Sequence, residues 1–485
     1  MIILLSAFVL TASAKDVAIY NIVDYGAVGN GIALDHGSIN SAIEACSHGG
    51  GGMVYVPSGT YLCGSIRMMS NVELHLESGA TLLAAPSSMK AYDEAEPWEG
   101  VAYQDGGHTY FHNSLIWAVG AENISITGRG MIDGKGLTRH DTERAGILQG
   151  GNIGTGDKSI ALKQCRNVLI RDITIFRGGH FAIILTGCEQ VNVDNVLIDT
   201  NRDGIDIDCC KYTSVSNCKV NTPNDDAIVL KSSYALKKPV LCESITISNC
   251  IVTGYKLGTM LDCTYQPEQV NWVCGRIKLG TESNGGYRDI TISNCTCIWS
   301  SGLAFEEVDQ GRMENIVVSN ISMNHVHHYP IYITTGCRNR GPKEVSSTSY
   351  GGNIQISNIL AQDVDSLAGI IITGMEDAPL EHIYLSNIRI QYRGGGRSDQ
   401  MRWDYREQGE NYPEPKFALS TPSYGLFARH VKDLRANNIT FTTIKPDYRP
   451  AIVLDDVEDA RFRDIDYPSS GESIVQRNCR GIKVQ

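Results

Sequence analysis

Residues 243–254 read ESITISNCIVTG, and residues 288–298 read RDITISNCTCI. Each stretch contains two short runs in which apolar and polar residues alternate, joined by a Ser-Asn step. Alternation with a period of two is typical of strands that bury one face, and Asn at a bend can bond the backbone or take a left-handed conformation. Variants of this phrase return throughout the chain after residue 123. The sequence therefore predicts an all-β chain built from one repeated unit.

The bend asparagines recur at a minimum interval that some repeats lengthen. Asn195 and Asn217 are 22 residues apart, and the later intervals are longer, with bend asparagines at 249, 294, 320, 358, 387 and 438. A coil of fixed cross-section with loops inserted on some turns gives this spacing. A β-sandwich also has short strands, but it gives no reason for the bend residue to recur in one place. We therefore expect residues 15–485 to form a single domain, a single-stranded parallel β-helix.

An amphipathic helix is expected near the start of this solenoid, over residues 38–46. Ile39, Ala42 and Ile43 share one face of such a helix, and Ser38 is the N-cap candidate. The end of a solenoid exposes strand edges and apolar core, so a helix that caps the first coil protects both.

The composition limits the classes of partner. Lys and Arg number 42 against 54 Asp and Glu, a formal net charge of −12, whereas nucleic acids and anionic membrane surfaces require a basic face. The first residues, MIILLSAFVLTASAKD, predict a signal peptide over residues 1–14 that ends in Ala-Ser-Ala, with a buried first strand as the alternative. No later run approaches the roughly 18 apolar residues of a membrane span. We expect a secreted or periplasmic protein that acts as a monomer.

Fifteen cysteines suggest disulfides at first, but their odd number and their spacing argue against a full framework. Cys218, Cys250 and Cys295 each follow a Ser-Asn step, which predicts small apolar residues stacked at one repeated core position. No CxxC pair stands beside a histidine cluster, so a zinc site is not expected.

Three acids stand where strands are expected to begin. Residues 201–210 read NRDGIDIDCC, and residues 225–233 read DDAIVLKSS. Because Asp203 and Asp225 are 22 residues apart, we expect them at equivalent positions on adjacent coils, about 4.8 Å apart, with Asp226 beside them. Like charges this close raise at least one pKa, which keeps a protonated acid beside an ionised base. Glycoside hydrolysis uses such a carboxyl pair, whereas a lone Asp in a turn commonly caps backbone amides.

A basic pair follows the acids. Arg276 and Lys278, in GRIKLGTESNGG, are two residues apart and therefore point to one face of a strand. In an acidic chain, such a pair favours recognition of an anionic group, and Arg can grip a carboxylate with two parallel hydrogen bonds. A solvated pair of surface charges is the alternative. Beside three acids, a uronic acid becomes the expected substrate unit.

These residues together resemble glycoside hydrolase family 28, the polygalacturonases and rhamnogalacturonan hydrolases. The resemblance covers most of the chain and rests on DYGAVGNG, GGGGMVYVPSGTY, NRDG, NDDAIVLKS, GRIKLGTESNGG and SGLAFEEVDQGRMENIVVSNI, in the order of the family. It implies a right-handed parallel β-helix and inverting hydrolysis of an acidic pectic polysaccharide or oligosaccharide. It implies no metal or other cofactor.

The resemblance also assigns roles to the acids. The family's Asn-Thr-Asp motif is similar to residues 201–203, with Arg in place of Thr, and its Gly-Asp-Asp motif is similar to residues 224–226, with Asn in place of Gly. By this likeness Asp225 is the general acid, while Asp203 and Asp226 position and deprotonate the water.

The same likeness assigns substrate contacts. Arg276 and Lys278 match the family's Arg-Ile-Lys motif, which holds a substrate carboxylate, and Lys231, in NDDAIVLKS, is expected to bind substrate as well. Where the family usually has Gly-His-Gly, this chain reads GYKLG, so Tyr255 stands there and no histidine does. The departure favours a divergent branch of the bacterial pectin-degrading type, with Tyr255 on the substrate side of the site.

Three insertions, at residues 89–113, 338–352 and 393–421, are long enough to wall off one end of a cleft. Such a wall favours an exo-acting galacturonidase, with polygalacturonan or rhamnogalacturonan fragments as substrate, over an endo-acting polygalacturonase or rhamnogalacturonan hydrolase. Two further functions stay open: a β-helix polysaccharide lyase that holds calcium, and a carbohydrate-binding or adhesive solenoid without catalysis.

Overall fold

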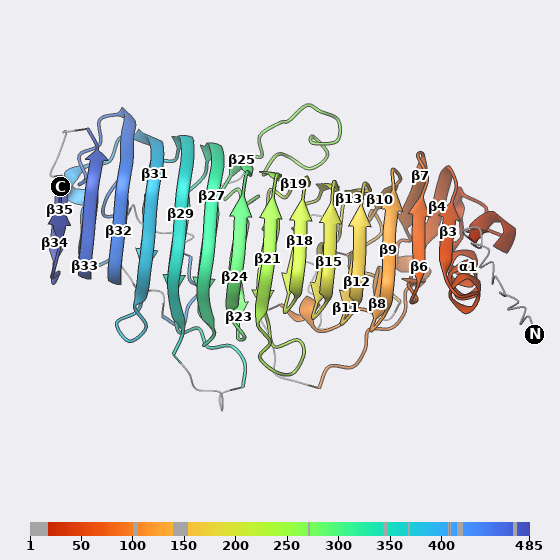
Figure 1. Cartoon of the computed structure of the whole chain (residues 1–485). Helices are drawn as coiled ribbons and strands as arrows, with labels where there is room; N and C mark the ends of the chain where they lie inside the picture. The colour runs from red at the N-terminus through yellow and green to blue at the C-terminus, as the bar shows by residue number, and fades with distance from the viewer. Residues whose placement is uncertain are drawn as a thin grey trace, which may run out of the picture.

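The computed structural model describes residues 18–99, 105–138, 154–269, 272–342, 348–366, 369–405, 407, 409–414, 421–468 and 473–485. The expected signal peptide, residues 1–14, lies outside the described residues. Within them the chain winds as a right-handed parallel β-helix whose coils stack along one axis from the N-terminus to the C-terminus (Figure 1). Among the helices of this part of the chain, none is long and apolar enough to cross a membrane.

The strands form three parallel sheets that run the length of the solenoid. Sheet one contains β5 (Ile66–Arg67), β8 (Ser114–Val119), β11 (Lys158–Lys163), β14 (Phe181–Thr186), β17 (Asp203–Asp208), β20 (Ile228–Ser232), β23 (Ile277–Ser283), β26 (Leu303–Glu307), β28 (Ile331–Thr335), β30 (Ile370–Thr373) and β34 (Ile474–Arg477). Sheet two contains β1 (Ile19–Asn21), β3 (Gly52–Val56), β6 (Val72–Leu76), β9 (Glu122–Gly128), β12 (Arg166–Arg171), β15 (Glu189–Asp194), β18 (Lys211–Ser216), β21 (Cys242–Ser248), β24 (Tyr287–Ser293) and β35 (Lys483–Val484). Sheet three contains β2 (Asn30–Leu34), β4 (Gly59–Cys63), β7 (Ala80–Ala84), β10 (Met131–Asp133), β13 (Thr174–Phe176), β16 (Leu197–Asp199), β19 (Lys219–Asn221), β22 (Ile251–Thr253) and β25 (Thr296–Ser300).

Towards the C-terminus longer strands bend from one sheet into the next. They are β27 (Arg312–Val326), β29 (Tyr350–Val364), β31 (Leu380–Gly394), β32 (Leu426–Lys445) and β33 (Ile452–Asp466). Four short 3-10 helices complete the described elements: η1 (Ile22–Tyr25), η2 (Ser87–Met89), η3 (Gly106–His108) and η4 (Ser398–Gln400).

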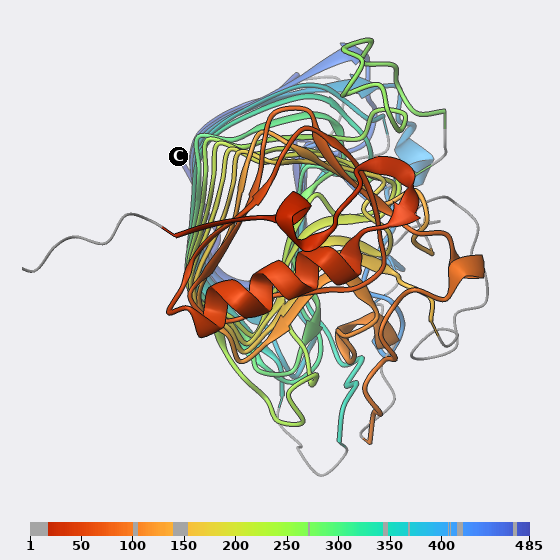
Figure 2. The same ribbon diagram turned by 90° about the vertical axis from the view of Figure 1, so that its right-hand side faces the viewer.

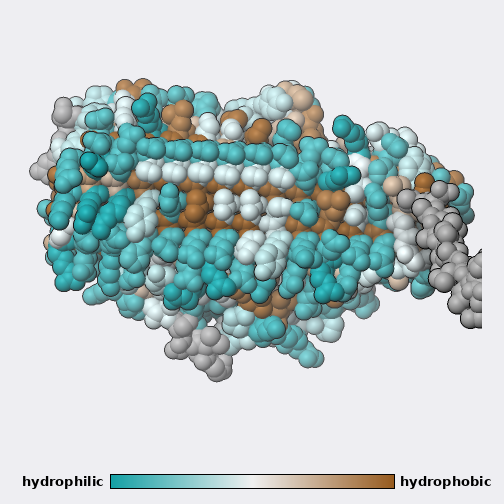
Figure 3. Space-filling view, in the orientation of Figure 1, coloured by the Kyte–Doolittle hydropathy of each residue, from teal (hydrophilic) through white to brown (hydrophobic). Residues whose placement is uncertain are grey.

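The bend asparagines stack as the repeat predicts. All eight of them take positive φ angles, between 52° and 59°, which confirms the left-handed bend. The Nδ2 of Asn320 donates to the Oδ1 of Asn294 at 3.0 Å, and the Nδ2 of Asn358 donates to the Oδ1 of Asn320 at 3.0 Å. Because equivalent residues of successive coils stack, surface residues of like hydropathy form rows along the axis (Figure 3). This side-chain ladder satisfies polar groups that the bends would otherwise leave to solvent.

The cysteines behave as core residues. Cys218, Cys250 and Cys295 are buried, and each directly precedes one of three residues in register, Lys219, Ile251 and Thr296, so the predicted stack is confirmed. All fifteen cysteines lie in the described part of the chain, and all are free thiols.

Helix α1 (His36–His48) lies across the first coil, as Figure 2 shows. It buries Ile39, Ala42 and Ile43, which confirms the predicted apolar face. The prediction of Ser38 as N-cap is wrong, because the helix begins two residues earlier and its N-cap is Asp35. The carboxylate of Asp35 does not cap the helix but accepts hydrogen bonds from the backbone of Val28 and Gly29.

Sheet one differs from the other two in being covered on both faces around its middle. One row of its inward side chains is apolar and contains Ile205, Ile228, Ile277, Leu303 and Ile331, all fully buried. Every residue of β17, β20, β23, β26 and β28 is buried, including those that point outward. Strands of sheet two, such as β18 and β24, instead alternate buried residues with half-buried or exposed ones. Loops therefore cover the outer face of sheet one, and this covered face carries charged side chains.

Candidate active site

The predicted acids gather at the amino-terminal edge of sheet one, where the chain arrives from sheet three. Asp203 begins β17, Asp225 and Asp226 lie in the turn before β20, and Arg276 directly precedes β23. Because parallel strands of one sheet all begin at the same edge, four residues from three coils come together here.

The strand register places these acids one residue away from the expected alignment. Ile205 pairs with Ile228, an offset of 23 rather than 22. Carried back along β17, this offset aligns Asp203 with Asp226, so the expectation that Asp203 and Asp225 are equivalent is wrong. Asp225 is the additional residue of the turn, and its side chain is about one quarter exposed, whereas those of Asp203 and Asp226 are 4% exposed.

Arg202 connects two of the acids. Its Nη1 lies 2.5 Å from Oδ2 of Asp225, and its Nη2 lies 3.8 Å from Oδ2 of Asp203. Burial, followed by the nearby charge of Asp225, raises the pKa of Asp203 well above its usual range, against the opposing effects of Lys231 and Arg202. Asp203 is therefore a buried carboxyl of raised pKa, beside the more exposed carboxyl of Asp225, which pairs with Arg202.

Asp226 has the opposite environment. Its Oδ1 accepts a hydrogen bond from Nε of Arg276 at 2.6 Å and one from the thiol of Cys274 at 3.3 Å, and Nζ of Lys278 lies 3.7 Å from Oδ2. Burial alone would raise its pKa, but Arg276 and then Lys278 outweigh burial and lower the pKa to about 2. The edge of sheet one thus holds a carboxyl of raised pKa on one coil and a carboxyl of lowered pKa on the next.

Arg276 and Lys278 point to one side, as predicted, and both contact a carboxylate that the sequence did not indicate. Nη1 and Nη2 of Arg276 donate to the two oxygens of Glu414 at 2.7 and 2.6 Å, and Nζ of Lys278 donates to Oε1 of Glu414 at 2.9 Å. Glu414 belongs to the insertion at residues 393–421. The only signal in the sequence was the length of that insertion, because Glu414 lies 138 residues from Arg276.

Lys231 belongs to a second charged cluster on the same outer face. Its Nζ donates to Oε2 of Glu282 at 2.9 Å and lies 4.0 Å from Oδ2 of Asp206. His108, in η3, lies 3.9 Å from Asp206 and 3.5 Å from Asp208. Burial opposes protonation of His108, but these two acids raise its pKa to about 9. Lys231 is thus held by acids of the scaffold, next to the coil of Asp203.

Tyr255 lies on the loop after β22. Its backbone N–H donates to Oδ1 of Asn221 at 2.7 Å, its carbonyl accepts from Nδ2 of Asn221 at 3.0 Å, and its ring lies 5.8 Å from that of Tyr265. Tyr255 and Lys231 are thus the predicted substrate-binding residues that lie outside the ion pairs of Asp203, Asp225 and Asp226 in the described part of the chain.

Two histidines approach the site from other coils. His180, directly before β14, has its Nε2 2.7 Å from Oδ2 of Asp105 and stacks on Phe181. His328, before β28, stacks on Trp272 with 3.9 Å between ring centroids, and burial lowers its pKa to about 4. Both lie beside strand starts of sheet one, on coils other than that of Tyr255, so counting along the chain could not place them.

All three predicted insertions contribute to the cover of sheet one. His108 of the first contacts Asp208, Arg338 of the second contacts Asp309 at 2.5 Å, and Glu414 of the third contacts Arg276. The acids are therefore flanked by loops on coils before and after them.

One group among the described residues has the atoms to hold a cation. Ligand atoms of Asp225, Asp226 and Cys274 lie within 4.8 Å of one another. The guanidinium of Arg276 already contacts Asp226 there. A metal would have to compete with that fixed positive charge.

Comparisons with known proteins agree with this arrangement. A family model described as rhamnogalacturonase A/epimerase, pectate lyase-like, matches residues 19–228. The chain is 24% identical over 446 residues to the exo-poly-alpha-D-galacturonosidase of Dickeya chrysanthemi, covering 79% of this chain and 69% of that one. It is 33% identical over 194 residues to the plasmin and fibronectin-binding protein A of Streptococcus pneumoniae, covering 38% of this chain and 25% of that one.

Among solved structures, the family 28 exopolygalacturonase of Yersinia enterocolitica aligns over 97% of this chain and 79% of its own, with a TM-score of 0.61 and 17% identity. The β-helix and the resemblance to the polygalacturonases of family 28 are thereby confirmed.

Proposed function

We propose that this chain is an inverting glycoside hydrolase that cleaves galacturonosyl linkages in pectic polysaccharide and acts from chain ends. The similarity to polygalacturonases supports the broader activity, a pectin-degrading glycoside hydrolase. The observation that carries the proposal is the contrast between two carboxyls at one sheet edge: the side chain of Asp225 is about one quarter exposed, and that of Asp226 is buried, with its pKa lowered by Arg276 and Lys278. Glycoside hydrolysis requires such a contrast, one carboxyl as acid and one as base.

In the proposed reaction the bond between the anomeric carbon and the leaving oxygen breaks as water attacks from the opposite face. Asp226, ionised and beside Arg276, accepts the proton of the water, and Asp203 helps to position it. Asp225, the most exposed of the three, donates its proton to the leaving oxygen. Arg202 pairs with Asp225 in this structure and so fixes the position of this carboxyl.

The covering loops support exo action. Described residues of all three insertions contact the coils around the acids, which suits a cleft closed at one end. The role of Arg276 and Lys278 in binding a substrate carboxylate, and those of Lys231 and Tyr255, stay predictions. Glu414 holds the basic pair in this structure.

Product analysis over time tests the proposal, with polygalacturonan and rhamnogalacturonan oligosaccharides as substrates and chromatography and mass as readouts. Saturated galacturonate from the first time point is the expected result, and Asp225→Asn should lower the rate about 10² to 10⁴-fold with the fold intact. A ladder of oligomers would refute exo action. Unsaturated products would point to a lyase, and near-parent activity of Asp225→Asn would overturn its assignment as the acid.

A binding protein without catalysis is the second candidate, favoured by the 33% identity to a plasmin and fibronectin-binding protein. It predicts that the parent chain and Asp225→Asn bind pectic oligosaccharides equally and that neither turns them over. Measurable hydrolysis by the parent that Asp225→Asn loses would exclude this candidate.

A further inference from the structure

We propose that Glu414 takes the place of a substrate carboxylate at Arg276 and Lys278, so that the sugar unit bound at this end of the site is a neutral one. The inference rests on the proposed function and narrows its substrate class. The substrate would be a pectic chain in which galacturonate alternates with a neutral sugar.

The first support is the geometry of the guanidinium. Arg276 donates from Nε to Asp226 and from both terminal nitrogens to Glu414, at distances of 2.6 to 2.7 Å. The edge that would grip a uronate carboxylate with two parallel hydrogen bonds is thus occupied by a carboxylate of the chain itself. Lys278 adds a third hydrogen bond to Glu414.

The second support is burial. The side chains of Arg276 and Lys278 are 1% exposed, and that of Glu414 is fully buried. A soluble ligand therefore cannot reach either cation while Glu414 is in place.

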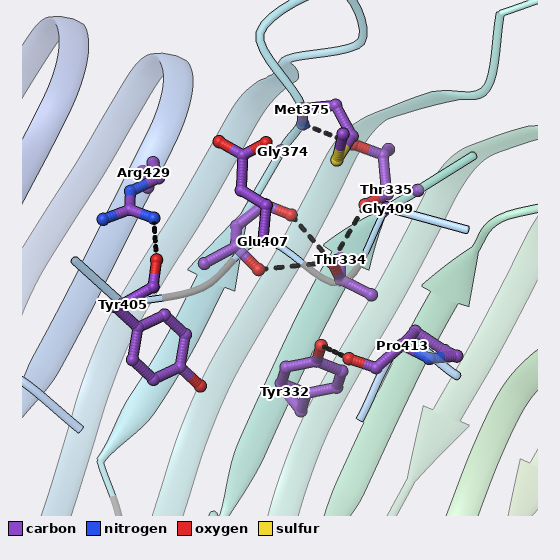
Figure 4. A pocket seen from close by; sticks show the side chains of 12 residues that line it. Tyr332, Thr334, Thr335, Gly374, Met375, Tyr405, Glu407, Gly409, Pro413 and Arg429 are labelled. Atoms are coloured by element: carbon purple, nitrogen blue, oxygen red, sulfur yellow. Dashed lines mark hydrogen bonds between the residues drawn. The ribbon is translucent and has the colours of Figure 1, made fainter. Parts of the chain in front are cut away.

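The third support is the way residues 411–414 are anchored. Pro413 accepts a hydrogen bond from the hydroxyl of Tyr332 at 2.6 Å, as Figure 4 shows. Nζ of Lys278 donates to the hydroxyl oxygen of Tyr412 at 3.0 Å, and the hydroxyl of Tyr329 donates to Glu414 at 3.3 Å. Contacts from β28 and from the residues before it thus hold the carboxylate in place from several sides.

The remaining charges reinforce the effect. Oδ2 of Asp226 lies 3.7 Å from Nζ of Lys278, so the carboxylates of Asp226 and Glu414 already surround the two cations. A uronate carboxylate brought here would meet negative charge, and like charges at contact disfavour binding. A neutral sugar meets no such repulsion.

Thermal melting of Glu414→Ala with added ligands tests the proposal without any need for catalysis. The control is Glu410→Ala, which removes an exposed carboxylate from the same loop. We expect Glu414→Ala to melt below the parent and to be restored by acetate. Galacturonate should stabilise Glu414→Ala at concentrations at least tenfold lower than those needed for the parent or the control, whereas galactose should not.

Galacturonate that stabilises the parent as well as Glu414→Ala would overturn the proposal, as would failure of both acetate and galacturonate to stabilise Glu414→Ala. Should that variant not fold, Glu414→Gln keeps the shape and removes the charge. For this variant, the hydrolysis rate on oligogalacturonate divided by the rate on rhamnogalacturonan oligosaccharides should be at least tenfold higher than for the parent. An unchanged ratio would refute the role of Glu414. If the chain does not hydrolyse pectic substrates, the melting results expected for Glu414→Ala would still be observed. A failure of the proposed function is therefore distinguishable from a failure of this inference.

Discussion

Replacing Asp203 by Asn separates catalysis from stability at the proposed site. Asp203 is a buried carboxyl whose pKa is raised by burial and by Asp225. The folded state therefore binds its proton more tightly than the unfolded chain, whose Asp has a pKa of about 3.9. Stability contributed by this group is present below that value and is lost as the pH rises towards the folded pKa, at about 1.4 kcal/mol per pH unit.

Asn has nearly the same shape as Asp and no charge to bury, so Asp203→Asn removes the loss of stability that Asp203 causes as the pH rises. We expect the variant to be as stable as the parent near pH 4 and more stable at pH 8, by about 1 kcal/mol or more. Its hydrolytic rate should nevertheless fall about 10²-fold, because Asp203 helps to position the attacking water. Chemical denaturation at both pH values and product release from pectic oligosaccharides measure the two effects.

Asp208 is the matched control, since it is the last residue of the same strand and is equally buried. It accepts hydrogen bonds from the backbone N–H and the hydroxyl of Ser233 at 2.8 and 2.6 Å. Against the effect of burial, His108 and Ser233 lower its pKa, so its contribution is present above pH 4 and is lost in acid. Asp208→Asn should therefore lower stability at neutral pH by about 1–3 kcal/mol. If Asp203→Asn is less stable than the parent at pH 8, or retains more than a tenth of its activity, the reasoning about Asp203 is refuted.

Three further variants or conditions probe the neighbouring charges. Arg202→Thr, which restores the residue of the family motif, removes a cation that opposes the raised pKa of Asp203. The loss of stability that Asp203 causes as the pH rises should therefore extend to higher pH, and an unchanged stability profile in denaturation curves would show that Arg202 does not affect the charge of Asp203. Chelators should leave the hydrolytic rate unchanged, since Arg276 supplies the positive charge beside Asp226; a loss that calcium restores would instead favour a lyase. Burial raises the pKa of Glu306 to about 8, against the opposing effect of Lys278, so the parent should lose stability as the pH rises from about 4.5 towards 8, by at most about 1.4 kcal/mol per pH unit. Glu306→Gln should reduce that loss, as measured by denaturation curves at pH 5 and 8. If the parent and the variant lose the same stability between these pH values, Glu306 is ionised in the folded protein.

The fold could be predicted from the sequence because its repeat is local. A bend residue such as Asn294 needs only its neighbours to take the left-handed conformation, and its ladder partner Asn320 repeats the same local pattern one coil later. The capping helix was predicted for the same reason, from three apolar residues on one face. Its start was missed because Asp35, although it is the N-cap, turns its side chain to the backbone of the preceding turn.

The alignment of the acids failed by one residue for a physical reason that the apolar pattern contained. The core position of Ile205 is taken on the next coil by Ile228 and not by Ala227, because the larger side chain fills the interior row. Counting between acids gave the shortest repeat interval and hid this offset. The additional residue lengthens the turn, and with it Asp225 is about one quarter exposed while Asp226 is buried against Arg276.

Glu414 could not be predicted by any local pattern, but the charge balance of the site required a group like it. A buried cation must be paired, because an unpaired charge in the interior costs several kcal/mol. Arg276 and Lys278 are both buried, and Asp226 alone cannot neutralise two positive charges. Either a substrate carboxylate or a side chain from elsewhere in the chain had to complete the cluster, and the structure places Glu414 there. The identity of the sugar that the site accepts thus depends on a residue outside every motif that indicated the activity.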